Sequence, residues 1–164
     1  MFDTNTIDAS DKTEFYRELA EQAASMVQGE PDETANAANL SALLFEQMPD
    51  LNWAGFYFLR SPDELVVGPF QGKPACVRIK VGKGVCGTAV ERRQSMLVED
   101  VDAFPGHIAC DSASRAELVV PLIKDGKVLG VLDLDSPKLA RFDAADQAGI
   151  EGVARIYVDA VVSA

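Results

Sequence analysis

The spacing of hydrophobic residues divides the chain into a helical start, a central run of strands and a helical end. Apolar side chains recur every three or four positions from residue 11 to 28, which predicts an amphipathic helix that ends at Gly29. Pro31 opens a second predicted helix, which stops at residues 48–50. Asp143 is placed to cap a last helix with a similar apolar stripe.

From residue 51 the apolar pattern changes to a period of two, which is typical of strands. Strands are predicted over residues 52–59, 64–68, 77–80, 96–99, 117–123 and 128–135. A short helix over 84–92 and a long loop over 100–115 lie between them. Because the strands follow one another without alternating crossover helices, we expect an α+β domain. Its sheet of about six strands would be predominantly antiparallel and flanked by N-terminal and C-terminal helices.

The chain has 164 residues and a net charge of −11, from 26 acidic against 15 basic side chains. A field of that sign repels phosphate backbones and anionic lipid head groups, which argues against nucleic acid and membranes as partners. The apolar runs are also far shorter than the roughly 20 residues that a membrane span needs. The N-terminus shows no targeting pattern, so we expect a cytoplasmic protein whose resting thiols are reduced.

Three cysteines lie in or beside predicted loops, where a thiol can reach both solvent and a ligand. Cys110 belongs to a polar segment at the end of the long loop. Cys86 comes at the start of the short helix, whose free backbone N–H groups should lower the pKa of its thiol. The position of Cys76 indicates nothing about reactivity. Each cysteine taken alone is as consistent with a small buried hydrophobic residue, but three near loops favour redox chemistry.

The same residues do not predict a metal site. The cysteines are ten and 24 positions apart and His107 is the one histidine, unlike structural zinc sites, whose ligands pair about two to four residues apart. His107 lies three residues before Cys110, so it could orient or protonate a group there, although a lone histidine is more often structural. The expected chemistry therefore uses no metal and no cofactor.

A second set of chemically active groups is acidic. Alternation along 128–135 puts Asp133 and Asp135 on one face of a strand. If residues 124–126 form a three-residue loop, Glu117 falls opposite Asp133, and repulsion within the cluster should keep at least one carboxyl group protonated near neutral pH. A two-residue turn would instead point Glu117 away. The alternative for all three is a solvated strand end.

Aromatic residues alternate in the first predicted strand. Trp53 and Tyr57 share one face, and Phe56 and Phe58 share the other. The phenylalanines are the natural core pair, which leaves the other two for a pocket that holds a methyl or thioether group. Aromatic residues in a strand are nevertheless more often part of a core.

Six segments together carry a resemblance to a known family: NWAGFYF at 52–58, GPFQGKPAC at 68–76, GKGVCGTAV at 82–90, FPGHIACDSAS at 104–114, ELVVPL at 117–122 and GVLDLDSP at 130–137. They strongly resemble the free methionine-(R)-sulfoxide reductases, enzymes built on a single GAF domain, over residues 30 to 160. The cysteines with HIACDSAS and LDLDSP are specific to this family, whereas VPL followed by GVL is common to many GAF domains. Ala116 departs from the family pattern, which more often has Ser before the glutamate.

The resemblance implies one GAF domain over residues 1–164, with residues 1–10 as a loose extension. It also implies an oxidoreductase that reduces the R epimer of free methionine sulfoxide and is recycled by thioredoxin. A thiolate attacks the sulfoxide sulfur, a protonated carboxyl group protonates the developing oxyanion, and methionine leaves a sulfenic acid behind. A second cysteine condenses with that acid to an intramolecular disulfide, which an external dithiol reduces. A homodimer is compatible with the resemblance.

Carried over to this chain, the resemblance identifies Cys110 as the attacking thiol. Our hypothesis is that Cys76 is its main resolving partner. Cys86 has the better helix-terminus environment, so it stays open as an alternative resolving thiol and as a nucleophile.

The resemblance also supplies the substrate site. Glu117, Asp133 and Asp135 match the groups that hold the sulfoxide and the ammonium of the free amino acid, and Glu117 is expected to act in catalysis as well. Trp53 and Tyr57 match the aromatic pocket around the methyl end.

Two other classes of function compete with the enzyme. GAF domains often sense small ligands such as cyclic nucleotides, so a non-catalytic sensor is the first alternative. The second is a redox switch whose disulfide changes a partner surface, but the chain has no amphipathic or charged docking segment that would favour it. Catalytic formation of methionine separates the enzyme from both.

Overall fold

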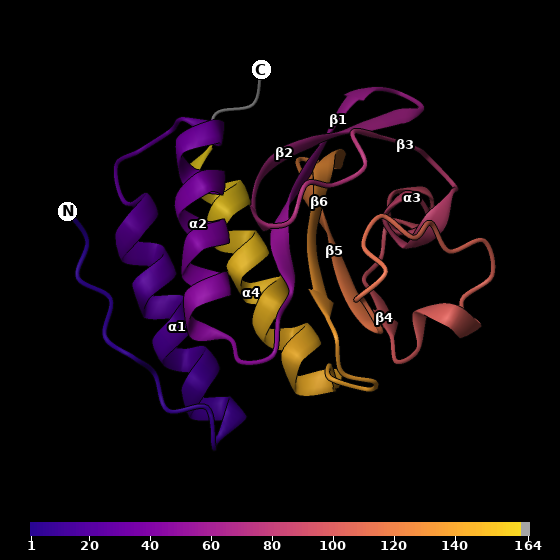
Figure 1. The fold of residues 1–164 in the computed structure, drawn as a ribbon. Helices are drawn as coiled ribbons and strands as arrows, with labels where there is room; N and C mark the ends of the chain where they lie inside the picture. The colour runs from indigo at the N-terminus through magenta and orange to yellow at the C-terminus, as the bar shows by residue number, and fades with distance from the viewer. Residues whose placement is uncertain (162–164) are drawn as a thin grey trace.

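Six strands form one antiparallel sheet in the computed structural model, which describes residues 1–161 (Figure 1). Across the sheet they follow the order β3-β2-β1-β6-β5-β4, so two hairpins meet through β1 and β6 at the centre. The strands are β1 (Trp53–Ser61), β2 (Glu64–Gly72), β3 (Arg78–Lys80), β4 (Met96–Val98), β5 (Ala116–Lys124) and β6 (Lys127–Ser136). The α+β fold and every predicted strand are confirmed.

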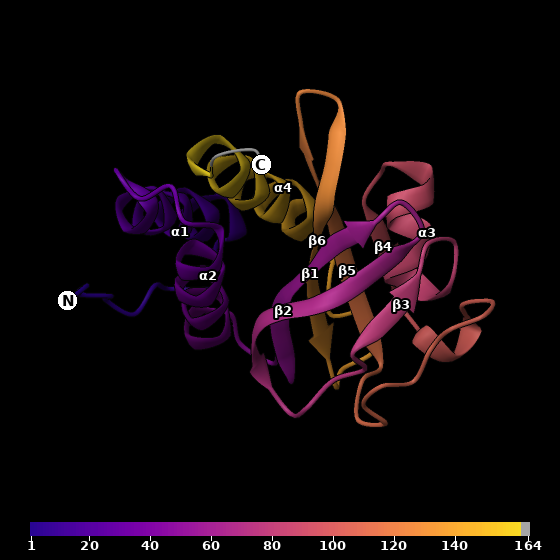
Figure 2. The same ribbon diagram turned by 90° about the horizontal axis from the view of Figure 1, so that it is seen from above.

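Helices cover the two faces of the sheet differently. α2 and α4 pack on one face with α1 outside them, and α3 packs on the other (Figures 1 and 2). The helices are α1 (Lys12–Val27), α2 (Glu33–Gln47), α3 (Gly84–Arg92), the 3₁₀ turn η1 (Val101–Ala103) and α4 (Ala144–Ala160). The prediction that Pro31 opens α2 was wrong by two residues, because Asp32 is its N-cap and accepts a hydrogen bond from the N–H of Ala35.

Alternation along β1 feeds two separate cores. Phe56 and Phe58 are buried with the side chains of α1, α2 and α4. Trp53 and Tyr57 are buried on the opposite face, among residues of α3. The predicted division of the aromatic residues is therefore confirmed, and it places Trp53 and Tyr57 on the α3 face of the sheet.

The β5–β6 hairpin turns over two residues and not over the predicted three. Asp125 and Gly126 have φ values of 51° and 79°, and Lys124 pairs with Lys127. Two consecutive left-handed residues are typical of the turn that the twist of a hairpin favours. This turn by itself would place Glu117 on the face covered by α2 and α4.

A β-bulge in β6 returns Glu117 to the α3 face. Leu129 has no partner in β5, and one extra residue reverses the side-chain alternation. Glu117 therefore falls opposite Asp135, not opposite Asp133 as predicted, and lines the same cavity as both aspartates. The predicted cluster forms, but through a register that the sequence pattern did not reveal.

The first residues of the chain lack regular secondary structure but are partly anchored. Ile7 is buried, and its N–H donates to Oε1 of Gln47 at 3.0 Å. The carbonyl of Asn5 accepts a hydrogen bond from Nε2 of the same glutamine at 2.9 Å. The segment expected to be a loose extension is thus fastened to α2 at these residues. None of the helices within residues 1–161 has the length and apolar character needed to cross a membrane.

A buried carboxylate ties the start of α4 to α1. Asp146 accepts hydrogen bonds from the hydroxyl of Tyr16 and the ammonium of Lys12, both at 2.7 Å. Asp143 is the N-cap of α4, as predicted, and forms a reciprocal capping box with Asp146. This side chain therefore holds together two helices that are distant in sequence.

Asp146→Ala is expected to lower the free energy of unfolding by about 3 kcal/mol, because it leaves a part-buried ammonium and a hydroxyl without their shared acceptor. Urea unfolding measures the change. Asp159→Ala, at an exposed position of the same helix, is the matched control. A loss no larger than that of the control would show that this network does not stabilise the fold.

Candidate active site

A cavity lies between the α3 face of the sheet, α3 itself and the loop that follows η1. About 40 Å³ of it is open to the centre of a water-sized molecule, and its whole empty space, open solvent at the mouth included, is about 550 Å³. Seven of the eight side chains expected to act in catalysis or substrate binding line it: Trp53, Tyr57, Cys86, Cys110, Glu117, Asp133 and Asp135. The eighth, Cys76, is bonded to one of these residues. The fold therefore gathers the whole predicted set at one place.

A disulfide joins Cys76 to Cys110, with 5.4 Å between their Cα atoms. It links the segment before β3 to the long loop after η1, and these two parts of the chain approach each other at the lower edge of Figure 2. Both cysteines are only partly buried. The structure is thus that of an oxidised state, with an accessible disulfide at the mouth of the cavity.

Side chains that the sequence reasoning missed hold this loop in place. The amide of Asn52 donates hydrogen bonds to the carboxylate of Asp111 at 3.1 Å and to the hydroxyl of Ser114 at 3.0 Å. Asp111 also accepts from the N–H of Ala113 at 2.9 Å, closing a local turn. The signal was available, since Asp-Ser-Ala-Ser is a sequence in which such turns are common.

Two carboxyl groups that line the cavity are buried. Glu117 is 7% exposed and Asp133 is 5% exposed. Burial, together with the charges of Asp133 and Asp135, raises the pKa of Glu117 well above its usual range. Burial raises the pKa of Asp133 to about 6, although hydrogen bonds with Glu117 and Cys86 act in the opposite direction.

Asp135 completes the acidic cluster. It is more open than its two neighbours, yet burial and the charge of Asp133 also raise its pKa well above the usual range. The predicted retention of a proton near neutral pH follows for the cluster as a whole. A carboxyl group that is protonated at pH 7 can donate a proton or a hydrogen bond to a ligand in the cavity.

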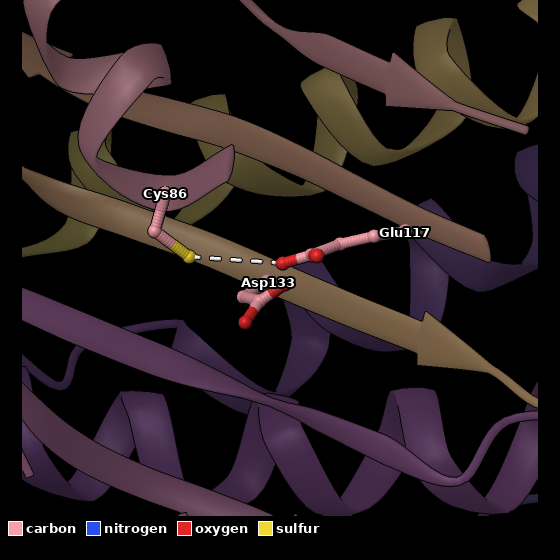
Figure 3. A group of neighbouring side chains, drawn as sticks. All are labelled: Cys86, Glu117 and Asp133. Atoms are coloured by element: carbon pink, nitrogen blue, oxygen red, sulfur yellow. Dashed lines mark hydrogen bonds between the residues drawn. The ribbon is translucent and has the colours of Figure 1, made fainter. Parts of the chain in front are cut away.

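The pKa of the Cys86 thiol is shifted in the direction opposite to our prediction. Its thiol is buried and donates a hydrogen bond of 3.9 Å to Oε1 of Glu117 (Figure 3). Burial, followed by the charges of Asp133 and Glu117, raises its pKa well above the usual value. The helix start that was expected to stabilise a thiolate is outweighed, because the side chain points away from solvent toward carboxyl groups.

Three potential metal ligands also meet here. Cys86 from α3, Glu117 from β5 and Asp133 from β6 point toward one another, and each offers an atom within 4.8 Å of the others (Figure 3). The sequence spacing does not indicate this grouping, since the ligands come from three separate elements. One oxygen of Asp133, Oδ1, is buried without a hydrogen-bond partner. A buried, unpartnered acceptor is ready for a donor from a ligand.

His107 lies at the edge of the same cluster. Its Nε2 is 3.8 Å from Oε2 of Glu117. Burial lowers the pKa of the imidazole, against the opposing charge of Asp102, so the ring is mainly neutral at pH 7. The histidine is thus part of the cavity wall, where it faces a carboxyl group.

The aromatic residues both line the cavity and anchor the segment that carries Cys76. Trp53 and Tyr57 stack with ring centroids 5.8 Å apart. The indole N–H donates to the carbonyl of Lys73 at 3.2 Å, and the phenol donates to the carbonyl of Cys76 at 2.9 Å. Their polar tips therefore fix one half of the disulfide, which the sequence did not predict.

Comparisons with known proteins address the family of this chain. The GAF domain family matches residues 34–162. The free methionine-R-sulfoxide reductase of Escherichia coli is 54% identical over 139 residues, which cover 85% of this chain and 84% of that protein. The chain belongs to the free methionine-R-sulfoxide reductase family. Its GAF fold is the one expected from the sequence.

Solved structures of similar chains have nearly the same fold as this family member. The free methionine-R-sulfoxide reductase of Neisseria meningitidis, in complex with its substrate, has a TM-score of 0.92 and 47% identity, covering 97% of this chain and 95% of that one. A GAF protein from Burkholderia vietnamiensis, described as a candidate sensor, has a TM-score of 0.89 and 59% identity, covering 93% and 96%.

Proposed function

We propose that this protein reduces free L-methionine (R)-sulfoxide to L-methionine with electrons from its own thiols. The observation that carries the proposal is the Cys76–Cys110 disulfide, which stands at the mouth of a cavity floored by proton-holding carboxyl groups. The similarity to a reductase of Neisseria meningitidis that was solved with its substrate supports the same conclusion.

The reaction begins with the thiolate of Cys110, which attacks the sulfoxide sulfur. Glu117 gives its proton to the sulfoxide oxygen. The resulting hydroxyl then passes from the substrate sulfur to the sulfur of Cys110, the S–S bond made by the attack breaks, methionine leaves, and Cys110 is left as a sulfenic acid. The thiol of Cys76 then attacks the sulfenic sulfur, water is released, and the disulfide of the present structure forms. Two electrons pass from the two thiols to one sulfoxide. Cys86 takes no part in this scheme.

The substrate is held by two kinds of side chain in the cavity. Asp133 and Asp135 accept hydrogen bonds from the ammonium of the free amino acid, for which the unpartnered Oδ1 of Asp133 is suited. Trp53 and Tyr57 contact the methyl group next to the sulfur. A methionine sulfoxide residue within a protein has an amide in place of the ammonium, so this arrangement selects the free amino acid.

The proposal also covers the reductant, the cellular location, the domain organisation and the oligomeric state. Thioredoxin is the reductant, the location is cytoplasmic, and the whole chain is a single GAF domain. The enzyme assembles as a homodimer, which light scattering on the purified protein tests directly.

A thiol count tests this function and the cysteine roles together. Reduced protein is mixed with excess methionine (R)-sulfoxide and no external reductant, and is then labelled at cysteine after denaturation. We expect one methionine per chain, the loss of two of three thiols, and a disulfide peptide that contains Cys76 and Cys110. The thiol of Cys86 should remain.

Other results would contradict specific parts of the scheme. Methionine formed without loss of thiols would exclude thiol chemistry. Loss of the Cys86 thiol in the first turnover would assign it a redox role. Binding of the sulfoxide without any methionine would favour a small-molecule sensor.

A further inference from the structure

The disulfide is bordered by two exposed aliphatic side chains. Val77, next to Cys76, is 58% exposed, and Ile108, two residues before Cys110, is 39% exposed. They are two of the five large hydrophobic residues exposed within residues 1–161. Since the half-cystines lie 5.4 Å apart at Cα, both aliphatic residues flank the same bond. The accessible disulfide therefore has an apolar rim.

The backbone holds both residues of this rim in place. The carbonyl of Val77 accepts a hydrogen bond of 2.9 Å from the N–H of Val67 in β2. The carbonyl of Ile108 accepts one of 3.2 Å from the N–H of Cys110. Ile108 also leans over the start of α3, where a Cβ added to Gly84 would lie 3.1 Å from its Cδ1. Both side chains are therefore exposed at defined positions beside a disulfide that a partner must reach.

On the Cys76 side of this rim the charge is opposite to that of the whole protein. Between Glu64 and Glu91 the sequence has four basic residues and no acidic one, although the net charge of the chain is −11. All four are exposed: Lys73, Arg78, Lys80 and Lys83. This segment includes Cys76 and Val77, so positive charge surrounds one half of the disulfide.

Part of this positive charge is free to act on a partner. Arg78 and Lys80 form ion pairs with Glu64, whereas Lys83 forms none with the residues described. On the Cys110 side, the loop carries Asp111, whose carboxylate is near Lys73. The positive field is therefore strongest on the Cys76 side, where Lys83 lies next to the residue that supports Ile108.

We propose that the surface formed by Val77, Ile108, Lys73 and Lys83 is the docking site for a protein dithiol whose own active-site rim is apolar and acidic. The inference rests on the proposed function, because it describes the partner that must reduce the disulfide in each catalytic cycle. Charge complementarity speeds the encounter, and contact with the aliphatic pair aligns the attacking sulfur with the S–S bond. A small uncharged dithiol needs neither feature.

The chemical step is a balanced thiol–disulfide exchange. A thiolate of the partner attacks the sulfur of Cys76 or Cys110, the S–S bond breaks, and the departing thiolate takes up a proton. The second thiol of the partner then loses its proton and attacks the partner's other sulfur, which is bonded to this protein in the mixed disulfide. That S–S bond breaks, and the second cysteine of this protein is released as a thiolate that takes up a proton. Two electrons move to this protein, and the partner becomes a disulfide.

The test compares two reductants in the same assay. Methionine formation from methionine (R)-sulfoxide is measured with a bacterial thioredoxin kept reduced by its reductase, and separately with dithiothreitol. Val77→Ser and Lys83→Glu are each expected to lower kcat/KM for thioredoxin about tenfold and to leave turnover with dithiothreitol unchanged. The effect of Lys83→Glu should shrink at about 1 M salt, where the screening length is roughly 3 Å.

Two substitutions far from the rim are the matched controls. Phe2→Ser removes an exposed apolar residue at the N-terminus, and Lys127→Glu makes the same charge change at the tip of the β5–β6 hairpin. Both sites lie away from the β2–β3 connection and the loop after η1 (Figure 2). Neither is expected to change kcat/KM for thioredoxin.

Other results would contradict either the docking surface or the proposed function. If the rim variants match the wild type with thioredoxin, or lose activity equally with dithiothreitol, the docking surface is wrong. If Val77→Ser changes the oligomeric state and leaves kcat/KM unchanged, the surface belongs to a second copy of the chain. If the wild type forms no methionine with either reductant, the proposed function itself fails.

Discussion

Reduced Cys110→Ser protein is expected to release no methionine from methionine (R)-sulfoxide, not even one equivalent in a single turnover. The serine hydroxyl is far less nucleophilic than a thiolate, and loss of a nucleophile costs at least about 10³-fold in rate. Rapid quenching and quantification of methionine measure the effect. The fold should be unaffected, because Cys110 is partly exposed in a loop and belongs to neither hydrophobic core.

The other two cysteines provide the controls for this experiment. Cys76→Ser should release one methionine per chain and then stall, since the sulfenic acid of Cys110 has no resolving partner. Cys86→Ser should turn over many times with thioredoxin. One equivalent of methionine from Cys110→Ser would instead make Cys86 the nucleophile, despite the burial that raises the pKa of its thiol.

Substitution of the buried carboxyl groups is expected to slow the enzyme and stabilise the protein at the same time. Glu117→Gln and Asp133→Asn should each lower turnover about 10²- to 10³-fold. The amide at 117 cannot deliver the proton that the departing oxygen needs, and the amide at 133 is a poorer acceptor for the substrate ammonium. Each should also raise the free energy of unfolding at about pH 7.5 by about 1 to 3 kcal/mol, because at that pH a buried carboxyl group must either carry a charge or take up a proton on folding.

The gain in stability should depend on pH in a defined direction. Burial raises the pKa of Asp133 to about 6 in the folded protein, against about 3.9 in an unfolded chain. The stability that this group contributes is fully present below about pH 4 and is lost as the pH rises through about 6. The free energy of unfolding of Asp133→Asn should therefore exceed that of the wild type most above about pH 6.5, and by little near pH 4.

Urea unfolding of wild type and variants across this pH range measures the effect. Asp159→Asn, on the exposed side of α4, is the control for removal of a carboxylate from the surface. A variant that is less stable than the wild type at neutral pH would show that Asp133 supports the fold through its charge. Activity lost in parallel with far-UV signal would exclude a role on the substrate.

Elements with a strong local signal could be predicted well from the sequence. The Gly84–Arg92 helix has the bounds that glycine punctuation indicates, and the alternation in β1 sorts Trp53 and Tyr57 from the phenylalanines. The candidate site follows from the same alternation, because residues on one strand face must share a cavity or a core. These predictions depend on contacts between residues that are close in sequence.

Two of the predictions that failed depend on contacts that are distant in sequence. The bulge at Leu129 leaves no mark in the hydrophobic pattern, yet it decides that Glu117 pairs with Asp135. The pKa of Cys86 follows from burial against two strands that the local sequence does not include. A helix terminus alone therefore could not indicate whether this thiol is acidic.

Incubation of the reduced protein with each epimer of free methionine sulfoxide, together with a thioredoxin recycling system, is the most direct test of the proposed function. Methionine formed over time is the quantity measured. We predict many turnovers with the R epimer and none with the S epimer. No methionine from either epimer, with folded protein and reduced thiols, would contradict the account and favour a ligand-sensing GAF domain.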